Sequence, residues 1–373
     1  MRPLQKLLEM KSAFRGKKSK IQGAGPERAP QSENSTRIHG MLRQFMDTIT
    51  DLLSCPDEHI GWAPDAVRRG YEITKANRVD CIYATGGPWS GLLAATVLHK
   101  LRRIPLVLDF RDPWASNPNL SAKSRLSRSV QARMESVCVR SAKMVIANTE
   151  ELRQDFAKRY VRMDSTKFAT VTNGFEQIPG KDFGSKDRFT LVHAGELYLS
   201  RNPLNFLRAV VDLLNRGAIP ANRLKIQLVG GLSINDAAME SALSSGVLRG
   251  VLEVKPRVSH DEVLPIQQNA SALLLIQTGL PLQVPRKLYE YLSLVRPILA
   301  IAEPQSATAR MVNELGAGYV ADDRVDAIKA AILELYRAWE SGAMPRVAEN
   351  KVHAYSNRYL SGKLRNIMLS CTL

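Results

Sequence analysis

Lys287 and Glu290 have the charges and the spacing to bind a phosphate and a sugar hydroxyl next to each other. They lie in the segment Val284–Leu292, between two apolar runs at 272–276 and 297–301 that are typical of buried strands. A short helix between two parallel strands directs its N-terminus to the edge of the sheet where open α/β sheets bind ligands. The segment is therefore predicted to present its first residues to a ligand.

Three features of this predicted helix favour a nucleotide. Pro285 suits the first helical turn, because it has no N–H to lose and its φ is already helical. Free backbone N–H groups there attract anions, and Lys287 adds a full positive charge. Glu290 lies three residues on along the same face, where a carboxylate can accept hydrogen bonds from ribose hydroxyls. The alternative is an ordinary surface pair of charges on a helix whose buried stripe is Leu288, Leu292 and Val295.

A second group of charges lies at the end of the predicted strand 105–110 and just after it: Asp109, Arg111 and Asp112. Charges at the end of a buried strand are costly unless they pair or serve a ligand. Because such strand ends are where these sheets bind ligands, we expect a functional role. A purely structural pairing of Arg111 with Asp112 is the alternative.

The preceding strand, 79–84, leads into a glycine loop that contains Gly86 and Gly87, and then into a predicted helix at 91–100. A strand, a glycine turn and a helix form an arrangement that can bind anions. A Gly-Gly-Pro turn also occurs for steric reasons alone.

The whole chain has 373 residues, enough for two domains, and a formal net charge of +16. This charge favours an anionic partner, such as phosphorylated substrates, phospholipid headgroups or nucleic acid. The first 31 residues hold eight basic and two acidic side chains and are expected to be disordered. No signal peptide or transmembrane helix is predicted. The cysteines do not have metal-ligand spacing and favour a reducing compartment; they are Cys55, Cys81, Cys138 and Cys371.

A basic amphipathic helix is predicted over residues 120–141. Its apolar stripe consists of Leu126, Val130, Met134 and Val137, and its other positions include Lys123, Arg125, Arg128, Arg133 and Arg140. Such a stripe usually packs on its own sheet, with a solvated basic face. The alternative is that the helix lies on anionic lipid.

Strands and helices alternate along most of the chain, which predicts an α/β fold with parallel sheets covered on both faces. Four motifs occur in order: 109–114 (DFRDPW), 173–176 (NGFE), 193–198 (HAGELY) with Arg201, and 286–292 (RKLYEYL). Together they resemble bacterial glycosyltransferases of family 4 type.

The resemblance implies the GT-B architecture, with two Rossmann-like domains facing a cleft. The implied organisation is a basic leader at 1–37, an N-terminal acceptor-side domain at 38–180, a C-terminal donor-binding domain at 181–345, and a helix at 346–373 that returns to the first domain. Family members open with strands that are not evident here, so the first domain is expected to be shortened.

The same resemblance implies roles for individual residues. Arg201 and Lys287 correspond to a clamp for the donor diphosphate, Glu290 to the ribose carboxylate, and Gly195 to a close approach of backbone to phosphate. Gly87 and either Arg111 or Asp112 face the reacting centre from the first domain. Arg111 and Asp112 are the expected catalytic residues, and Gly86 and Gly87 form the expected acceptor-side loop. The family often has a glutamate where this chain has Leu282.

These residues imply transfer of a sugar from a nucleotide-sugar to a saccharide or lipid-linked acceptor, at the cytoplasmic face of the membrane. No cofactor is expected. No Asp-x-Asp motif is present, which agrees with metal-independent transfer. The alternatives are an inactive sugar-nucleotide-binding protein and, from charge alone, a nucleic-acid-binding protein. The last is not favoured, because the basic residues are not interleaved with aromatic ones.

Overall fold

A computed structural model describes residues 50–51, 54–122, 124–176, 187–198, 201–233 and 237–372. The chain divides between Val145 and Ile146 into two compact units, each of which is described by itself. The predicted leader and the predicted boundary at 180/181 lie outside the described residues.

The first unit is built on parallel strands. Its elements are α3 (Ala63–Ala76), β1 (Ile82–Gly86), α4 (Ser90–Arg102), β2 (Leu106–Phe110), α5 (Arg125–Ser141) and the start of β3 (Met144–Ala147). The strand order is β1-β2-β3-β4, where β4 is Phe168–Thr170, and Ile82 of β1 pairs in parallel with Leu106 of β2. All five residues of β2 are buried, as expected for a strand covered on both faces.

Helix α5 buries a different face from the one predicted. Its buried residues are Ser127, Gln131, Glu135, Cys138 and Val139, while Leu126 is 55% exposed and Val137 40% exposed. The predicted packing of the apolar stripe on the sheet is therefore wrong. The physical reason is that the polar face receives hydrogen bonds from the loop after β2: Trp114 Nε1 donates to Gln131 Oε1 at 3.0 Å, and the Ala115 N–H donates to Glu135 Oε2 at 2.8 Å.

The second unit carries a six-stranded sheet in the order β10-β9-β8-β5-β6-β7. Its strands are β5 (Phe189–Ala194), β6 (Leu224–Val229), β7 (Leu252–Lys255), β8 (Ala272–Ile276), β9 (Ile298–Ile301) and β10 (Gly318–Ala321). Its helices are α6 (Glu150–Arg159), α7 (Leu204–Asn215), α8 (Ala237–Leu243), α9 (His260–Gln268), α10 (Arg286–Ser293), α11 (Ala307–Leu315), α12 (Val325–Glu340), α13 (Glu349–His353) and α14 (Asn357–Thr372).

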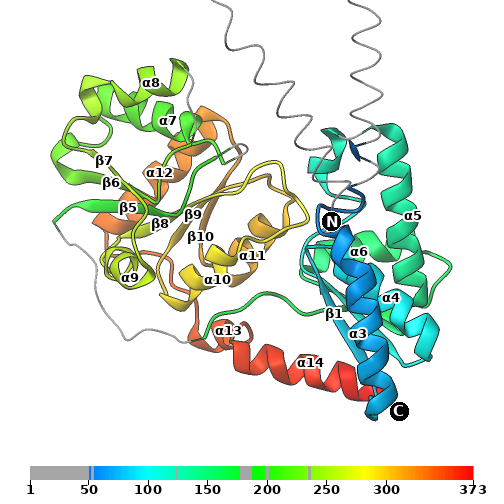
Figure 1. Ribbon diagram of the computed structural model, residues 1–373. Helices are drawn as coiled ribbons and strands as arrows, with labels where there is room; N and C mark the ends of the chain where they lie inside the picture. Colours follow the sequence, from blue (N-terminus) through cyan, green and yellow to red (C-terminus); the bar gives the residue numbers. More distant parts are fainter. Residues whose placement is uncertain are drawn as a thin grey trace, which may run out of the picture. The chain divides into compact units, whose positions relative to one another are not determined.

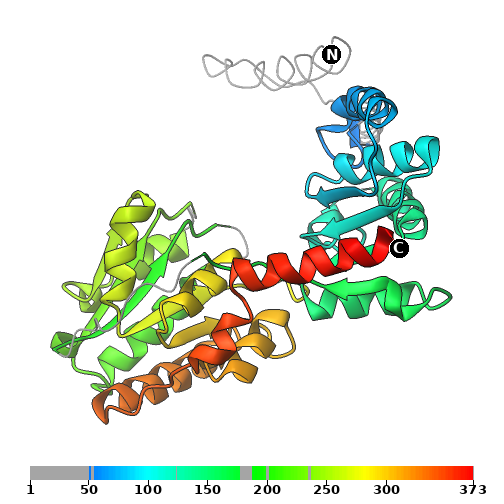
Figure 2. The same ribbon diagram turned by 90° about the horizontal axis from the view of Figure 1, so that it is seen from below.

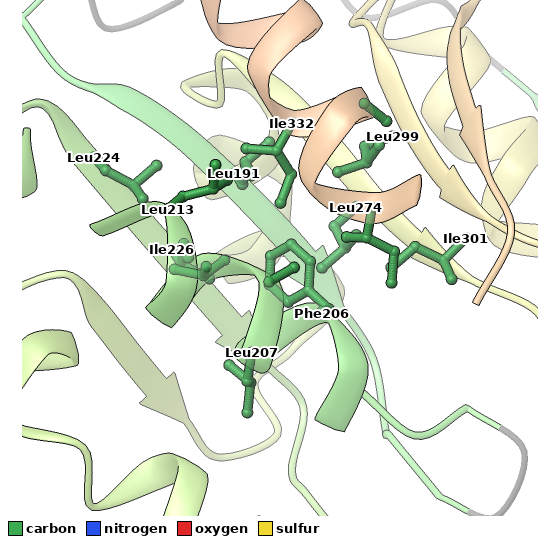
Figure 3. Packing of buried hydrophobic residues seen from close by; sticks show 14 of the residues in the cluster. Leu191, Phe206, Leu207, Leu213, Leu224, Ile226, Leu274, Leu299, Ile301 and Ile332 are labelled. Atoms are coloured by element: carbon green, nitrogen blue, oxygen red, sulfur yellow. The ribbon is translucent and has the colours of Figure 1, made fainter. Parts of the chain in front are cut away.

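Successive residues of these strands point to opposite faces of the sheet, and both faces are covered (Figures 1 and 2). Leu274 and Leu299 pack in one core with α7 and α12, where Phe206 and Ile332 lie (Figure 3). Leu273 and Ile298, one residue earlier in each strand, pack in a second core with α10 and α11. This two-sided burial explains why the strands are continuous apolar runs in the sequence.

The strand order reverses at β5 and β8, which are neighbours in space and pair in parallel through Leu191–Ala272 and Val192–Leu273. In open α/β sheets, ligands bind outside the carboxyl ends of the strands at such a reversal. Gly195 follows β5 and Gln277 follows β8, so the fold directs these residues to the expected ligand-binding edge.

Two alanine substitutions on α5 test which of its faces is buried. Gln131→Ala leaves the indole N–H of Trp114 buried without its partner and is expected to lower the free energy of unfolding by about 1–3 kcal/mol. Leu126→Ala removes an exposed side chain and should change it by less than about 0.5 kcal/mol. Urea denaturation of both variants measures this, and a larger loss for Leu126→Ala would contradict the observed orientation.

Candidate functional site

Lys287 lies directly against Gly195 at the reversal of the second sheet. A Cβ atom on Gly195 would be 1.9 Å from Lys287 Nζ, and the φ of Gly195 is +120°. The backbone conformation therefore favours glycine at this position, and any side chain there would also displace the ammonium group. The ammonium group thus occupies the space that a side chain at 195 would fill.

Lys287 is the second residue of α10, and Pro285 is the N-cap of that helix, with ψ at 144°. Pro285 was predicted inside the first turn and instead lies one residue before it. The buried side of α10 includes Leu288 and Leu292 as predicted, but Val295 lies beyond the helix end with φ at +54°.

Charges and burial lower the pKa of the Lys287 ammonium to about 8. Burial is the largest cause, and the neighbouring Arg201 guanidinium is the second; Glu290 and Glu196 partly oppose them. Two cations are therefore held close together with incomplete compensation. An anion bound between them would relieve their repulsion.

Arg201 is held in place by polar and aromatic contacts. Its Nε donates to Gln277 Oε1 at 3.3 Å, and its guanidinium donates to the hydroxyl of Tyr198 at 3.3 Å. The same guanidinium lies 5.3 Å from the centre of the Tyr198 ring, which is within the range of a cation–π contact. These partners restrain the side chain without neutralising its charge.

Glu290 forms an ion pair with Arg286 one turn earlier, with 3.2 Å between Oε1 and Nε. The Arg286 side chain is 80% exposed and that of Glu290 35% exposed, so the pair contributes little to stability. The Glu290 carboxylate also raises the pKa of Lys287, against the effects of burial and Arg201. The structure thus brings the charges of Arg201, Lys287 and Glu290 together, as predicted, and their individual roles stay predictions.

His193, in β5, is a member of this cluster that the sequence reasoning did not single out as a site residue. Its side chain is fully buried, and its Nδ1 lies 3.0 Å from the Leu274 carbonyl oxygen. Burial and the charge of Lys287 lower its pKa to about 3, so the ring is neutral at physiological pH. A histidine inside an apolar strand, two residues before a glycine turn, is the signal that could have identified it.

In the first unit, the predicted acceptor-side residues meet at the ends of β1 and β2. Gly87 has φ at +111°, and a Cβ atom there would be 3.5 Å from Asp112 Oδ2. A Cβ atom on Gly86 would be 2.5 Å from the Leu92 side chain, so this glycine is required by packing. The Arg111 N–H donates to the Gly86 carbonyl at 3.1 Å. The loop and the strand end are therefore one local structure.

The start of α4 already has a carboxylate. Asp57 accepts hydrogen bonds from the Ser90 N–H at 2.9 Å and from the Ser90 hydroxyl at 2.6 Å. A protein carboxylate therefore lies at the start of α4, where the sequence pattern allowed an anion to bind. Asp57 lies 33 residues from Ser90 in the sequence, so no local pattern could have identified it.

Asp109 holds Arg111 in place. Arg111 donates to the two oxygens of Asp109 at 3.2 and 3.3 Å, and the Tyr83 hydroxyl donates to Asp109 Oδ2 at 2.5 Å. Burial raises the pKa of Asp109, while Arg111 opposes this shift. The charges at the end of β2 therefore include an internal ion pair between Arg111 and Asp109.

Within the described ranges, no group of three or more histidine, cysteine, aspartate or glutamate side chains is placed to hold a metal ion. No helix among the same residues combines the length and the apolar character needed to cross a membrane.

Comparison with known proteins identifies the architecture. Residues 36–174 match the sequence family described as Glycosyl transferase 4-like domain. No curated protein sequence matches the chain.

Three solved structures illustrate the shared fold. A glycosyltransferase from Rickettsia africae is 10% identical, with a TM-score of 0.60 over 96% of this chain and 87% of the other. Anabaena HepE, solved in complex with UDP, is 14% identical, with a TM-score of 0.59 over 83% and 82%. The UDP-forming α,α-trehalose-phosphate synthase from Burkholderia vietnamiensis is 11% identical, with a TM-score of 0.57 over 87% and 80%.

At these identities the structural likeness shows the fold alone. It confirms the predicted α/β architecture of GT-B type. With the family match in the N-terminal region, it also confirms the resemblance to family 4-type glycosyltransferases.

The coupling of Lys287 to Arg201 can be tested on Lys287 itself. In Arg201→Gln a neighbouring positive charge is lost, so the pKa of Lys287 should rise above its value of about 8 in the parent protein. Acylation of Lys287 by an amine reagent, followed against pH by mass spectrometry, gives the midpoint of its deprotonation. The same lysine is compared in both proteins, and an unchanged midpoint would contradict the coupling.

Proposed function

We propose that this chain is a glycosyltransferase that binds the nucleoside diphosphate of a nucleotide-sugar donor at Lys287 and Arg201. The observation that carries the proposal is the Lys287 ammonium against Gly195, with the charge of Arg201 acting on it, at the strand reversal of a GT-B fold. The site has the charge, the close backbone approach and the place in the fold that a diphosphate requires.

The reaction breaks the bond between the anomeric carbon of the sugar and a phosphate oxygen, and an acceptor hydroxyl oxygen forms the new bond to that carbon. The proton of this hydroxyl passes to the carboxylate of Asp112 or to water. The electron pair of the broken bond stays on the departing nucleoside diphosphate, where negative charge increases. Lys287 and Arg201 stabilise this charge by electrostatic preorganisation, and one such group typically contributes about 3 kcal/mol. Because protein cations supply this stabilisation, we propose that transfer is independent of metal ions.

Glu290 is proposed to bind the ribose, since its partly exposed carboxylate lies on the same helix as Lys287. UDP is the first nucleotide to test, because one solved structure with this fold contains UDP and another is described as UDP-forming. Arg111 and Asp112, beside the Gly86–Gly87 loop, are proposed to bind and orient the acceptor hydroxyl.

We further propose that the acceptor is a saccharide or a lipid-linked saccharide, and that the protein acts at the inner face of the cytoplasmic membrane. Helix α5 supports this, because its apolar Leu126 and Val137 are exposed among basic residues instead of packing on the sheet. These basic residues are Arg125, Arg128, Arg133 and Arg140, all exposed. Exposed apolar and basic side chains on one helix fit an anionic lipid surface.

The proposed donor site is tested with UDP. Glu290→Ala should weaken UDP binding by about tenfold or more, since it removes a charged hydrogen-bond acceptor. Isothermal titration calorimetry measures this, with Arg286→Ala as the control, because Arg286 is the surface partner of Glu290. If both variants bind UDP like the parent, or lose affinity equally, the ribose assignment fails.

Transfer itself is tested with Arg201→Ala. The loss of one cation at the leaving diphosphate should slow UDP release from a UDP-sugar by about a hundredfold. A coupled assay for free UDP, run over a panel of UDP-sugars, follows this. A parent protein that binds UDP but releases none from any sugar donor, with saccharide acceptors present, would favour the sugar-nucleotide-binding alternative.

Membrane contact is tested by flotation with vesicles of phosphatidylcholine, with and without phosphatidylglycerol. The double variant Arg133→Glu/Arg140→Glu should bind anionic vesicles roughly thirtyfold more weakly or worse. The matched control is Arg249→Glu/Arg257→Glu, which changes the net charge equally at exposed positions of the second unit. Equal losses in both double variants would show a general charge effect and not a surface on α5.

A further inference from the structure

His193 presents one nitrogen whose role the proposed reaction leaves unexplained. The side chain is 1% exposed, and its Nδ1 lies 3.0 Å from the Leu274 carbonyl oxygen. Its Nε2 is buried and has no hydrogen-bond partner among the residues that the structure describes. Buried polar atoms almost always have partners, so a nearby donor is expected to reach this nitrogen.

The contact of Nδ1 determines the chemical character of Nε2. A carbonyl oxygen only accepts hydrogen bonds, so Nδ1 carries the proton and donates to Leu274. In a neutral imidazole the other nitrogen is then an acceptor. The ring is neutral, because burial and the charges of Lys287 and Arg201 lower its pKa to about 3, although the Leu274 and Gly195 carbonyls act in the opposite direction. Nε2 therefore needs a donor.

Two donors lie close enough to act on the ring electrostatically. Lys287 has the larger effect of the two, and Arg201 the smaller. Arg201 already donates to Gln277 and Tyr198. The Lys287 ammonium lies over Gly195, two residues after His193 in the chain, and carries three N–H groups on a flexible stem.

We propose that His193 is a positioning residue for Lys287, and that its Nε2 accepts one N–H of the ammonium while the other N–H groups bind the donor diphosphate. This inference rests on the proposed function of the donor site. A neutral acceptor beside the ammonium favours its charged form. The pKa of Lys287, about 8, reflects burial and the neighbouring charges, so a hydrogen bond to Nε2 would increase the charged fraction of the ammonium around pH 8.

Two substitutions separate the acceptor from the bulk of the ring. His193→Phe keeps an aromatic ring but has no acceptor, and His193→Gln keeps a side-chain oxygen that can accept. The deprotonation midpoint of Lys287 is measured by pH-dependent acylation and mass spectrometry, without nucleotide. We expect it to fall by about one pH unit in His193→Phe and by much less in His193→Gln.

UDP affinity should follow the same shift. A midpoint one unit lower reduces the charged fraction of Lys287 about fivefold at pH 8 and leaves it almost unchanged at pH 6.5. His193→Phe should therefore lose roughly fivefold in affinity at pH 8 but little at pH 6.5. A merely structural role would lower the melting temperature without making the loss depend on pH.

The parent protein provides a measurement that needs no variant to fold. With ¹⁵N-labelled histidine, His193 should show the tautomer protonated at Nδ1 from pH 6 to pH 9. A proton on Nε2, or an unchanged Lys287 midpoint in His193→Phe, would overturn the proposal. So would an affinity loss of equal size at both pH values, which would indicate a direct contact with the nucleotide. A parent that does not bind UDP would refute the donor site alone, because the acylation midpoint is measured without it.

Discussion

The contact between the Lys287 ammonium and Gly195 is the constraint on which the second unit depends. It requires a glycine with a positive φ after β5, a helix that starts at Arg286, and the strand reversal that brings β5 beside β8. Apolar packing meets these requirements, since the strands and α10 are held by two apolar cores. Apolar burial thus stabilises two neighbouring cations whose mutual repulsion would otherwise disfavour the arrangement.

In the first unit, buried and half-buried polar side chains position the loops. Asp109 fixes Arg111, Asp57 occupies the start of α4, and Gln131 receives the indole N–H of Trp114. Each lies in or next to a loop that carries a proposed site residue or leads into α5. Such contacts have defined directions, whereas apolar packing does not, so they determine the orientation of these loops.

The sequence predicted the elements of the second unit well, because a strand that is buried on both faces is an uninterrupted apolar run. The bounds of β8 agree with the predicted run 272–276, and β9 begins one residue later than the predicted run 297–301. It failed on α5, because an apolar stripe has the same spacing whether it is buried or exposed, and polar contacts from distant residues decided the orientation. The cluster of Arg201, Lys287 and Glu290 was predictable from motifs. The roles of Asp57 and Asp109 were not, because they depend on partners that no local pattern reveals.

Gly230 extends the constraint at Gly195 to a neighbouring loop. A Cβ atom on Gly230 would lie 2.6 Å from the backbone of Gly195, and Gly230 itself has φ at +128°. Two positions in adjacent loops are therefore closed to every residue with a side chain. Under the proposed function, differences in donor preference are expected at neighbouring side chains, such as Glu196, and not at these two glycines. The backbone contact between the two glycines is thus the invariant part of these adjacent loops, and the side chains beside it are the part that can change.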